Sequence, residues 1–194
     1  IIVGTTVLNT SNSFLCTGKN YSDFILEFDF KVDPSINSGV QIRSKSLPEY
    51  QDGRVHGYQV EIDPSGRAFT GGIYDEARRG WLYPLNDEEN DDARTAFINE
   101  EWNSIRIEAI GNNIKTWVNG IPVTNLYDDV DSTGFIALQV HSIGQESKMI
   151  GKHIMWKNIR IVSEDAVKYA TSTSAKVRSY LVNTLTEQEV AVGW

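Results

Sequence analysis

The sequence predicts an all-β protein: an antiparallel β-sandwich or jelly roll with a short C-terminal helical or irregular appendage. Three observations support this prediction. Apolar and polar residues alternate with a period of two in many short runs, Gly, Asn, Asp and Pro separate these runs, and helical periodicity is almost absent before residue 163. Many short strands at this spacing are typical of sandwiches and jelly rolls.

The expected strands follow one another along the chain, and one pair forms a clear hairpin. In "AIGNNIKTWVNG" a strand leads into a turn built on Gly111, Asn112 and Asn113, and a second strand ends in a turn at Asn119 and Gly120. This turn chemistry predicts a β-hairpin. The other expected strands are "FILEFDFKV", "SGVQIRS", "GYQVEID", "GFIALQVH" and "IRIV".

Two stretches break the alternation. Residues 85–97, "LNDEENDDARTAF", have too few apolar residues for a core strand and predict a solvated loop with room for one helical turn. From Glu164 the alternation ends, and Thr184 or Thr186 could cap a short helix, because glutamates follow in what would be its first turn. We therefore expect a jelly-roll domain and a tail outside the sandwich, over residues 1–163 and 164–194.

Composition restricts the function classes. The chain has 194 residues, 40% of them hydrophobic, which suits the core of one compact domain. Its formal charge of -8 repels phosphate backbones, so no nucleic-acid partner is expected. The single cysteine, Cys16, excludes an internal disulfide and leaves the redox compartment open. No apolar run reaches the roughly 18 residues that span a bilayer, so no membrane-spanning segment is expected.

The start of the chain does not indicate that the protein is located in the cytosol. The sequence begins at Ile1 without a methionine, which we interpret as a processed or trimmed start. A signal peptide that has been removed would leave the same start. The compartment is therefore open on composition alone.

Three of the expected strands place apolar residues on one face and hydrogen-bonding residues on the other. These polar faces could be the solvated sides of half-buried strands, as antiparallel sheets often have. Alternatively, they form a concave surface for sugar hydroxyls, because their side chains are planar and can each make several hydrogen bonds. In the second interpretation, Trp81 and Tyr83 supply a flat wall for a sugar ring, and Tyr74 projects nearby or packs in the core. The outward-facing residues are Gln41, Arg43, Gln59, Glu61, Asp63, Gln139 and His141.

Six sequence blocks carry a more specific signal. They are "NSGVQIR", "GYQVEID", "TGGIYD", "EWNSIRIEAIGNNIKTWVNG", "GFIALQVH" and "KNIRI". In this order and spacing, the region from Tyr21 to Val162 closely resembles the 3-keto-disaccharide hydrolase domain family. The resemblance implies a concanavalin A-like jelly roll, a periplasmic or secreted bacterial protein, and cleavage of glycosides oxidised at the 3-position.

Both ends of the chain depart from the family pattern. The usual opening, an "LFDG" stretch followed by a tryptophan, is missing before Ile1, so we expect an unpaired sheet edge or one completed by the tail or a neighbour. The C-terminal "LTEQEVAVGW" resembles the lead-in to another copy of the same domain. A second copy in a longer protein is therefore a possible partner.

Glu61 and Asp63 are the first candidates for acid–base chemistry. They stand two residues apart on one strand, so their Cα atoms should lie about 7 Å apart with both carboxylates on one face. Retaining laminarinase-type glycosidases of the same fold superfamily carry a second glutamate where this chain has Gly66. A double displacement needs two carboxyl groups about 5 to 5.5 Å apart, so this mechanism is disfavoured.

The 3-keto sugar that the resemblance implies favours another route. Its carbonyl acidifies the proton on C2, so the glycosidic oxygen at C1 can leave by elimination before water adds. Glu61 or His141 is the expected base, Asp63 a second acid or base, and Arg43 the group that stabilises the oxyanion. His141 could also be an ordinary strand-end histidine bonded to a loop. The expected substrate-binding residues are Gln41, Gln59, Tyr74, Trp81, Tyr83 and Gln139.

Two further alternatives stay open. A divalent metal could replace Arg43, with Glu61, Asp63 and His141 as ligands, but the sequence shows no tight ligand motif and we predict no metal site. A non-catalytic carbohydrate-binding, lectin-like module is the alternative to an enzyme, because jelly rolls host both functions.

Overall fold

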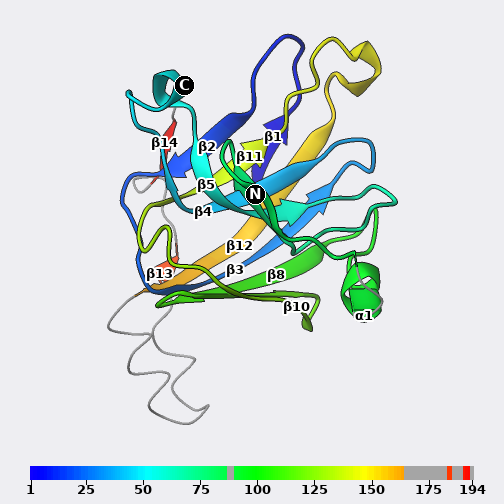
Figure 1. Cartoon of the computed structure of the whole chain (residues 1–194). Helices are drawn as coiled ribbons and strands as arrows, with labels where there is room; N and C mark the ends of the chain where they lie inside the picture. Colours follow the sequence, from blue (N-terminus) through cyan, green and yellow to red (C-terminus); the bar gives the residue numbers. More distant parts are fainter. Residues whose placement is uncertain (87–89, 164–182, 185–189, 193–194) are drawn as a thin grey trace.

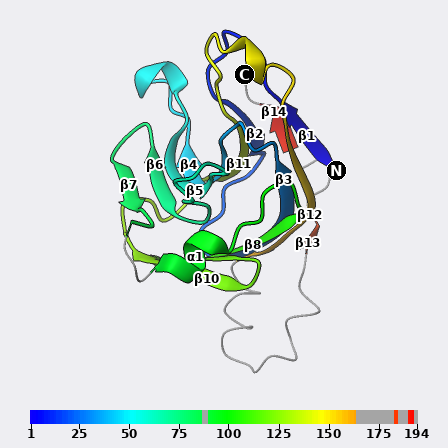
Figure 2. The same ribbon diagram turned by 90° about the vertical axis from the view of Figure 1, so that its right-hand side faces the viewer.

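A computed structural model describes residues 1–86, 90–163, 183–184 and 190–192. Two antiparallel sheets face each other across one core (Figures 1 and 2). The predicted all-β sandwich is therefore confirmed. Sheet A has the order β1 (Ile2–Thr5), β12 (His153–Ser163), β3 (Phe24–Val32), β8 (Asn103–Ile110), β9 (Asn113–Val118), β10 (Ile121–Tyr127), with β13 (Asn183–Thr184) also on β12.

Sheet B lies opposite sheet A and contains the strands with the candidate polar faces. Its order is β14 (Val190–Val192), β2 (Ser13–Thr17), β11 (Phe135–Val140), β4 (Ser38–Lys45), β5 (His56–Ile62), β6 (Ile73–Glu76), β7 (Gly80–Tyr83).

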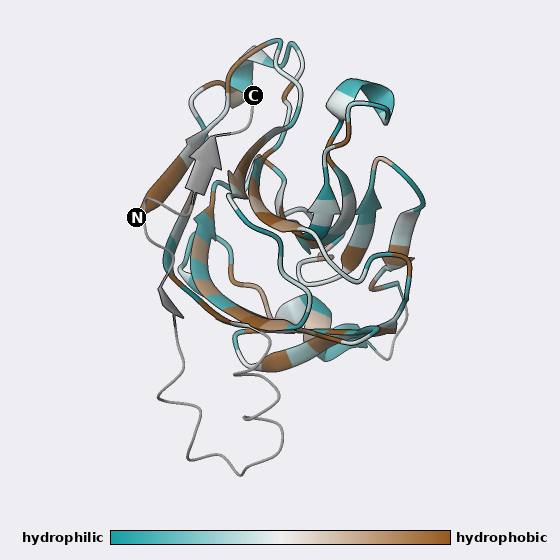
Figure 3. Cartoon of the chain, turned by 90° about the vertical axis from the view of Figure 1, so that its left-hand side faces the viewer, coloured by the Kyte–Doolittle hydropathy of each residue, from teal (hydrophilic) through white to brown (hydrophobic). Residues whose placement is uncertain are grey.

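Sequence alternation explains how the sheets stack. In β3 every second residue from Phe24 to Val32 is apolar and buried, and the intervening residues are only half-buried. Figure 3 shows this alternation as teal and brown bands along the strands. From sheet B, Val40, Val60 and Ile62 join the core. Burial of these apolar faces against each other is the main stabilising contribution to a sandwich.

The predicted hairpin is confirmed. β8 and β9 pair antiparallel from Ile105 opposite Val118 to Ile110 opposite Asn113. The turn between them contains Gly111, whose φ of 56° is in the left-handed region. The turn chemistry seen in the sequence therefore determines the connection.

The acidic stretch forms the predicted helical turn. Residues 91–95 form α1 (Asp91–Thr95), which lies beside β10 (Figure 2). Ala93 and Ala96 are buried there, so the turn packs its small apolar side chains against the sandwich. Residues 87–89 lie outside the described part of the chain.

The described parts of the tail pair with both sheets. β13 pairs with β12, and β14 pairs with β2, with Val192 opposite Leu15. Thr184 lies in β13, whereas Thr186 and most of the expected C-terminal helix lie outside the described residues. At the N-terminus, β1 pairs with β12. In the part of the chain that the structure describes, no helix is long and apolar enough to cross a membrane.

Candidate functional site

The polar face of sheet B is buried instead of solvated. Every residue of β5 is buried, so this strand is covered on both faces. Gln41 and Gln139 have 0% of their surface exposed, Gln59 has 3% and Glu61 has 4%. Buried polar groups require hydrogen-bond partners, and these four side chains find them mainly in one another.

The amides form a chain of hydrogen bonds that runs in one direction. The Ser44 hydroxyl donates to Gln41 Oε1 at 2.7 Å, and Gln41 Nε2 donates to Gln59 Oε1 at 2.7 Å. Gln139 Nε2 donates to the same Gln59 oxygen at 2.8 Å, and Gln59 Nε2 donates to Glu61 Oε2 at 2.9 Å. The chain therefore ends on the Glu61 carboxylate. We call Gln41, Ser44, Gln59, Glu61 and Gln139 the amide network.

A glycine makes room for this network. Gly39 lies opposite Glu61 on the neighbouring strand, and a Cβ atom there would stand 2.6 Å from the side chain of Gln59. Since Gln59 lies across Gly39, any larger residue at this position would displace it. The "NSGV" motif thus supplies the space in which Gln59 reaches both Gln41 and Glu61.

The Glu61 carboxylate also accepts hydrogen bonds from outside the amide network. In addition to Gln59, Asn37 Nδ2 donates to its Oε1 at 2.7 Å, and Arg67 Nη2 donates to the same oxygen at 3.1 Å. Burial raises the pKa of Glu61, and the bonds from Asn37, Gln59 and Arg67 offset only part of this effect. A buried carboxyl group with a raised pKa is suited to taking and returning a proton near neutral pH.

Asp63 has a different role from Glu61. Its carboxylate accepts hydrogen bonds from the Ser65 hydroxyl at 2.6 Å and from Arg67 Nε at 2.7 Å, and also from the backbone N–H groups of Ser65 and Phe69. Burial alone would raise the pKa of Asp63, but the bonds from Ser65 and Arg67 outweigh it and lower the pKa. Asp63 therefore shapes the turn after β5 and holds Arg67 against Glu61.

Arg67 joins the network to aromatic side chains. Its guanidinium carbon lies 5.0 Å from the ring centroid of Trp81 and 5.2 Å from that of Phe69. The rings of Tyr74 and Trp81 are 5.2 Å apart, and Tyr74 lies opposite Gln59. Tyr74 and Trp81 therefore form an aromatic pair beside Arg67 and Gln59.

Tyr83 does not share that position. It lies opposite Ile73, which is fully buried, and it packs against the core between the sheets. A register shift between Ile73 and Tyr74 separates Tyr83 from Trp81, although the two are only two residues apart. Tyr83, expected with Trp81 as a wall beside the polar face, therefore lies at the end of β7 on the side of Ile73.

The outward orientation predicted for Arg43 is wrong. The β4–β5 register shifts after Ile42, and Arg43 has a φ of 47°. Its guanidinium donates to the carbonyls of Ser22 and Gly111 at 2.7 Å each and to Asp23 at 3.2 Å, and the residue is fully buried. A β-bulge thus redirects the side chain away from the amide network, toward the β8–β9 turn.

His141 belongs to a second polar group. Its Nδ1 lies 2.7 Å from the carbonyl of Ser142, as the ordinary strand-end interpretation expects. It lies near Glu76, whose carboxyl group also faces Arg54 and Asn12. Among the described contacts, none joins His141 to Glu61.

Sequence reasoning missed Asn37 and Arg67. Both lie in turns next to the predicted strands, so the alternation rule assigned them to no face. A signal for Arg67 was present, because "DPSGR" places an aspartate and serine at a turn with a cation four residues on. Within the described residues, no group of three or more His, Cys, Asp or Glu side chains is arranged to hold a metal ion.

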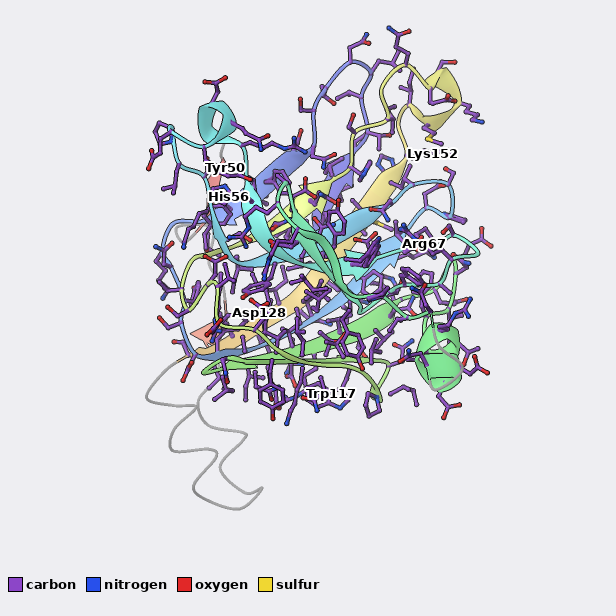
Figure 4. The ribbon with its side chains drawn as sticks, viewed as in Figure 1. Tyr50, His56, Arg67, Trp117, Asp128 and Lys152 are labelled. Atoms are coloured by element: carbon purple, nitrogen blue, oxygen red, sulfur yellow. The ribbon has the colours of Figure 1, made fainter. Side chains whose placement is uncertain are left out.

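A cavity of about 1180 Å³ adjoins the amide network without including Glu61 in its walls. Phe14, one of its lining residues, lies opposite Gln139, and Glu76, another, lies opposite Gly57. Figure 4 shows Tyr50 and His56, which flank the loop on this cavity, far from Arg67. Arg67 and Trp81, which lie on the Glu61 side of the amide network, are also not among the residues that line this cavity.

The match to a family model and the two-sheet fold together define a carbohydrate-related jelly-roll domain. The model of the 3-keto-alpha-glucoside-1,2-lyase-like domain family matches residues 1–162. This chain belongs to that family, and the resemblance seen in the sequence motifs is confirmed.

Solved structures support the fold. A proposed glycosyl hydrolase from Parabacteroides distasonis is 23% identical with a TM-score of 0.55, over 80% of this chain and 85% of that one. The carbohydrate binding module CBM66 from Bacillus subtilis is 16% identical with a TM-score of 0.54, over 82% and 90%. A galectin-like protein of unknown function from Bacillus subtilis is 12% identical with a TM-score of 0.56, over 82% and 80%. A comparison with curated proteins gave no match.

Proposed function

We propose that this domain cleaves the glycosidic bond of 3-keto-glycosides, with Glu61 as the proton-transfer group. The observation that carries the proposal is the buried Glu61 carboxylate. Its pKa is raised, and it accepts three hydrogen bonds, one of them from Arg67. Membership of the 3-keto-alpha-glucoside-1,2-lyase-like family supports the same substrate class.

The proposed reaction is an elimination followed by hydration. Glu61 takes the proton from C2, and the electron pair of that C–H bond forms an enolate with the C3 carbonyl. The enolate then expels the oxygen on C1, which takes up a proton as the leaving group departs. Water adds to C1 and a proton returns to C2, so the net reaction is hydrolysis without any oxidant or reductant.

Arg67 replaces Arg43 as the proposed electrostatic partner. Its side chain is 44% exposed, although Glu61 and Asp63 hold its guanidinium in place. A cation fixed in this way is suited to stabilising the negative charge of an enolate. Trp81 and Tyr74 are the proposed apolar wall for the sugar ring, and Gln59, Gln41 and Gln139 hold Glu61 through the amide network.

Asp63 does not suit a double displacement. Both of its oxygens accept bonds from the turn and from Arg67, so it is held as a positioning residue and not as a free nucleophile. This arrangement favours elimination over a covalent glycosyl intermediate.

The test is turnover of an oxidised glycoside. Purified protein should release sugar from 3-keto-trehalose or a 3-keto-glucoside and not from the unoxidised glycoside. Glu61→Gln should abolish this release and leave the fold intact, because it removes the proton-transfer group and keeps the shape. The exposed Glu49→Gln is the matched control, expected to retain full activity. Full activity of Glu61→Gln would exclude Glu61 as acid or base and favour His141.

A carbohydrate-binding module is the second candidate. The observation in its favour is that Glu61 is only 4% exposed, so its carboxylate could simply support the sheet. In that case the oxidised glycoside would bind without being cleaved, and Glu61→Gln would lose thermal stability. We further propose a periplasmic or secreted location and a second copy of the domain in the full-length protein, both supported by the family resemblance.

A further inference from the structure

Two distant strands of sheet B are joined above its polar face. Glu76 lies on β6 and points to the same side as Gln59, because Tyr74, two residues before it, stands opposite Gln59. Asn12 directly precedes β2, which is four strands away, and its side chain nevertheless hydrogen-bonds the Glu76 carboxylate. In a flat sheet, with about 4.8 Å between strands, β2 and β6 would lie about 19 Å apart. The contact therefore crosses the polar face of the three strands between them.

Each partner of this contact is held from its own side. The Oδ1 atom of Asn12 accepts a hydrogen bond from the Ser142 backbone N–H at 2.8 Å, which ties the loop before β2 to the end of β11. On the other side Arg54 approaches the Glu76 carboxylate at 3.6 Å, and His141 lies near it. We call the Asn12–Glu76 bond, with Arg54 beside it, the cross-sheet contact.

The amides beneath the cross-sheet contact are closed off from solvent. Gln139, Gln41 and Gln59 lie on β11, β4 and β5, the three strands that the contact crosses. Gln139 and Gln41 have 0% of their surface exposed, and Gln59 has 3%. A ligand can therefore reach these side chains only when the groups above them move.

One of the three amides has an acceptor without a donor. Gln139 Nε2 donates to Gln59 Oε1 at 2.8 Å, so Gln139 Oε1 points away from Gln59. This oxygen is buried and has no hydrogen-bond partner among the described residues. Turning the amide over would set the Gln139 oxygen against the Gln59 oxygen and remove a bond. Since buried acceptors are almost always paired, a ligand that brings a donor would satisfy this atom.

We propose that the cross-sheet contact is a latch over a hydroxyl-binding position of the sugar site, and that Gln139 Oε1 is the acceptor at this position. When Glu76 separates from Asn12, a pyranose enters between β2 and β6, and one of its hydroxyl groups donates to Gln139 Oε1. This new hydrogen bond offsets the loss of the Asn12–Glu76 bond, so the sugar favours the open form. The inference rests on the proposed function for the sugar as the ligand, whereas the latch itself does not depend on it.

Exchange of side-chain amide hydrogens tests the latch without any ligand. In NMR, the NH2 protons of Gln41, Gln59 and Gln139 should exchange slowly with water in the wild type. In Glu76→Ala they should exchange about tenfold faster or more, because the truncated side chain no longer crosses the sheet. Glu49→Ala, at an exposed glutamate, is the matched control and should keep the slow exchange.

A second variant guards against a packing defect in the first. Asn12→Asp keeps the oxygen that accepts from the Ser142 N–H and places a carboxylate against Glu76 instead of a donating amide. It should raise the exchange rates as Glu76→Ala does, and Asn20→Asp, at an exposed asparagine, should not. If both latch variants exchange as slowly as their controls, the contact does not close the face and the inference is overturned.

Trehalose, which the proposed reaction leaves uncleaved, tests the hydroxyl-binding position. It should shift the NMR signal of the Gln139 side-chain carbonyl carbon and bind both latch variants about tenfold more tightly than the wild type, because their open form is more populated. The absence of binding, an unmoved Gln139 signal at saturation, or equal affinity for wild type and variants would overturn the inference. The expected binding without any cleavage of 3-keto-trehalose would overturn the proposed function and leave the latch standing.

Discussion

At the scale of single residues, the pKa values of Asp63 and Glu61 are shifted in opposite directions, although the two residues are only two positions apart and share one arginine. The pKa of Asp63 is lowered, whereas that of Glu61 is raised. The difference follows from their partners: Asp63 accepts bonds from two backbone N–H groups, a hydroxyl and a guanidinium, whereas two of the three donors to Glu61 are neutral side-chain amides.

The first prediction concerns Asp63→Asn. Loss of charge-assisted bonds in the turn should lower the free energy of unfolding by about 2 kcal/mol at pH 7. Because the folded pKa of Asp63 is depressed, its stabilising contribution is present above the ordinary carboxyl pKa and is lost as pH falls through the folded value. The difference between wild type and variant, measured by urea unfolding, should therefore shrink with acidification. A difference that grows in acid would contradict this assignment.

The contribution of Glu61 to folding stability depends on pH with the opposite sign to that of Asp63. A carboxyl group whose folded pKa is raised binds its proton more tightly in the folded state, so its stabilising contribution is full below the ordinary pKa and is lost as pH rises through the folded value. In a comparison of wild type with Glu61→Gln, the melting temperature of the wild type should fall relative to the variant as pH rises. A relative fall on acidification would refute the raised pKa.

Arg43 is predicted to be structural. Arg43→Ala would remove the donor to two buried backbone carbonyls and one of the two donors to Asp23 Oδ1, and should lower the free energy of unfolding by about 3 kcal/mol or more. The exposed Arg160→Ala is the comparison, expected within about 0.5 kcal/mol of wild type in the same denaturant experiment. Equal effects of the two substitutions would show that the buried bonds of Arg43 contribute little.

At the scale of the elements, β4 is the strand on which the network depends. Gly39→Ala places a methyl group within 2.6 Å of Gln59. Displacing Gln59 breaks its bonds to Glu61, Gln41 and Gln139, so we expect a loss of about 2 kcal/mol of stability together with a loss of turnover. Gly66→Ala is the control, because nothing lies within 4 Å of its Cβ position. If Gly39→Ala keeps full turnover, the geometry of the network is not required for catalysis.

The same strand shows what the sequence could and could not predict. Alternation correctly placed Gln41, Gln59 and Gln139 on one face, because regular strands fix the side of each residue. It failed at Arg43, where a register shift changes the side, and it could not reach Arg67, whose position depends on a turn. It left a solvated face and a sugar-binding surface as alternatives and did not foresee burial on both sides of β5, because that burial depends on loops and side chains from elsewhere in the chain.

At the scale of the whole molecule, the described parts of the tail cover strand edges of both sheets. β14 pairs with β2, and β13 pairs with β12. A chain shortened to end at Ser163 would expose the edge of β2, and an uncovered edge is a template for pairing with another chain. We expect concentration-dependent self-association of the shortened chain in sedimentation experiments, with the full chain as reference. A strictly monomeric shortened chain would show that the β2 edge is protected in another way.

Because its hydrogen bonds run in one direction, the amide network has one arrangement when Glu61 is ionised and another when Glu61 carries a proton. A proton on Glu61 Oε2 would face Gln59 Nε2, donor against donor, so Gln59 would have to turn over its amide. Its oxygen would then no longer face Gln41 and Gln139, and both would have to turn as well. One proton on Glu61 is thereby coupled to the orientation of three amides, and the farthest, Gln139, stands opposite Phe14, two strands away from Gln59.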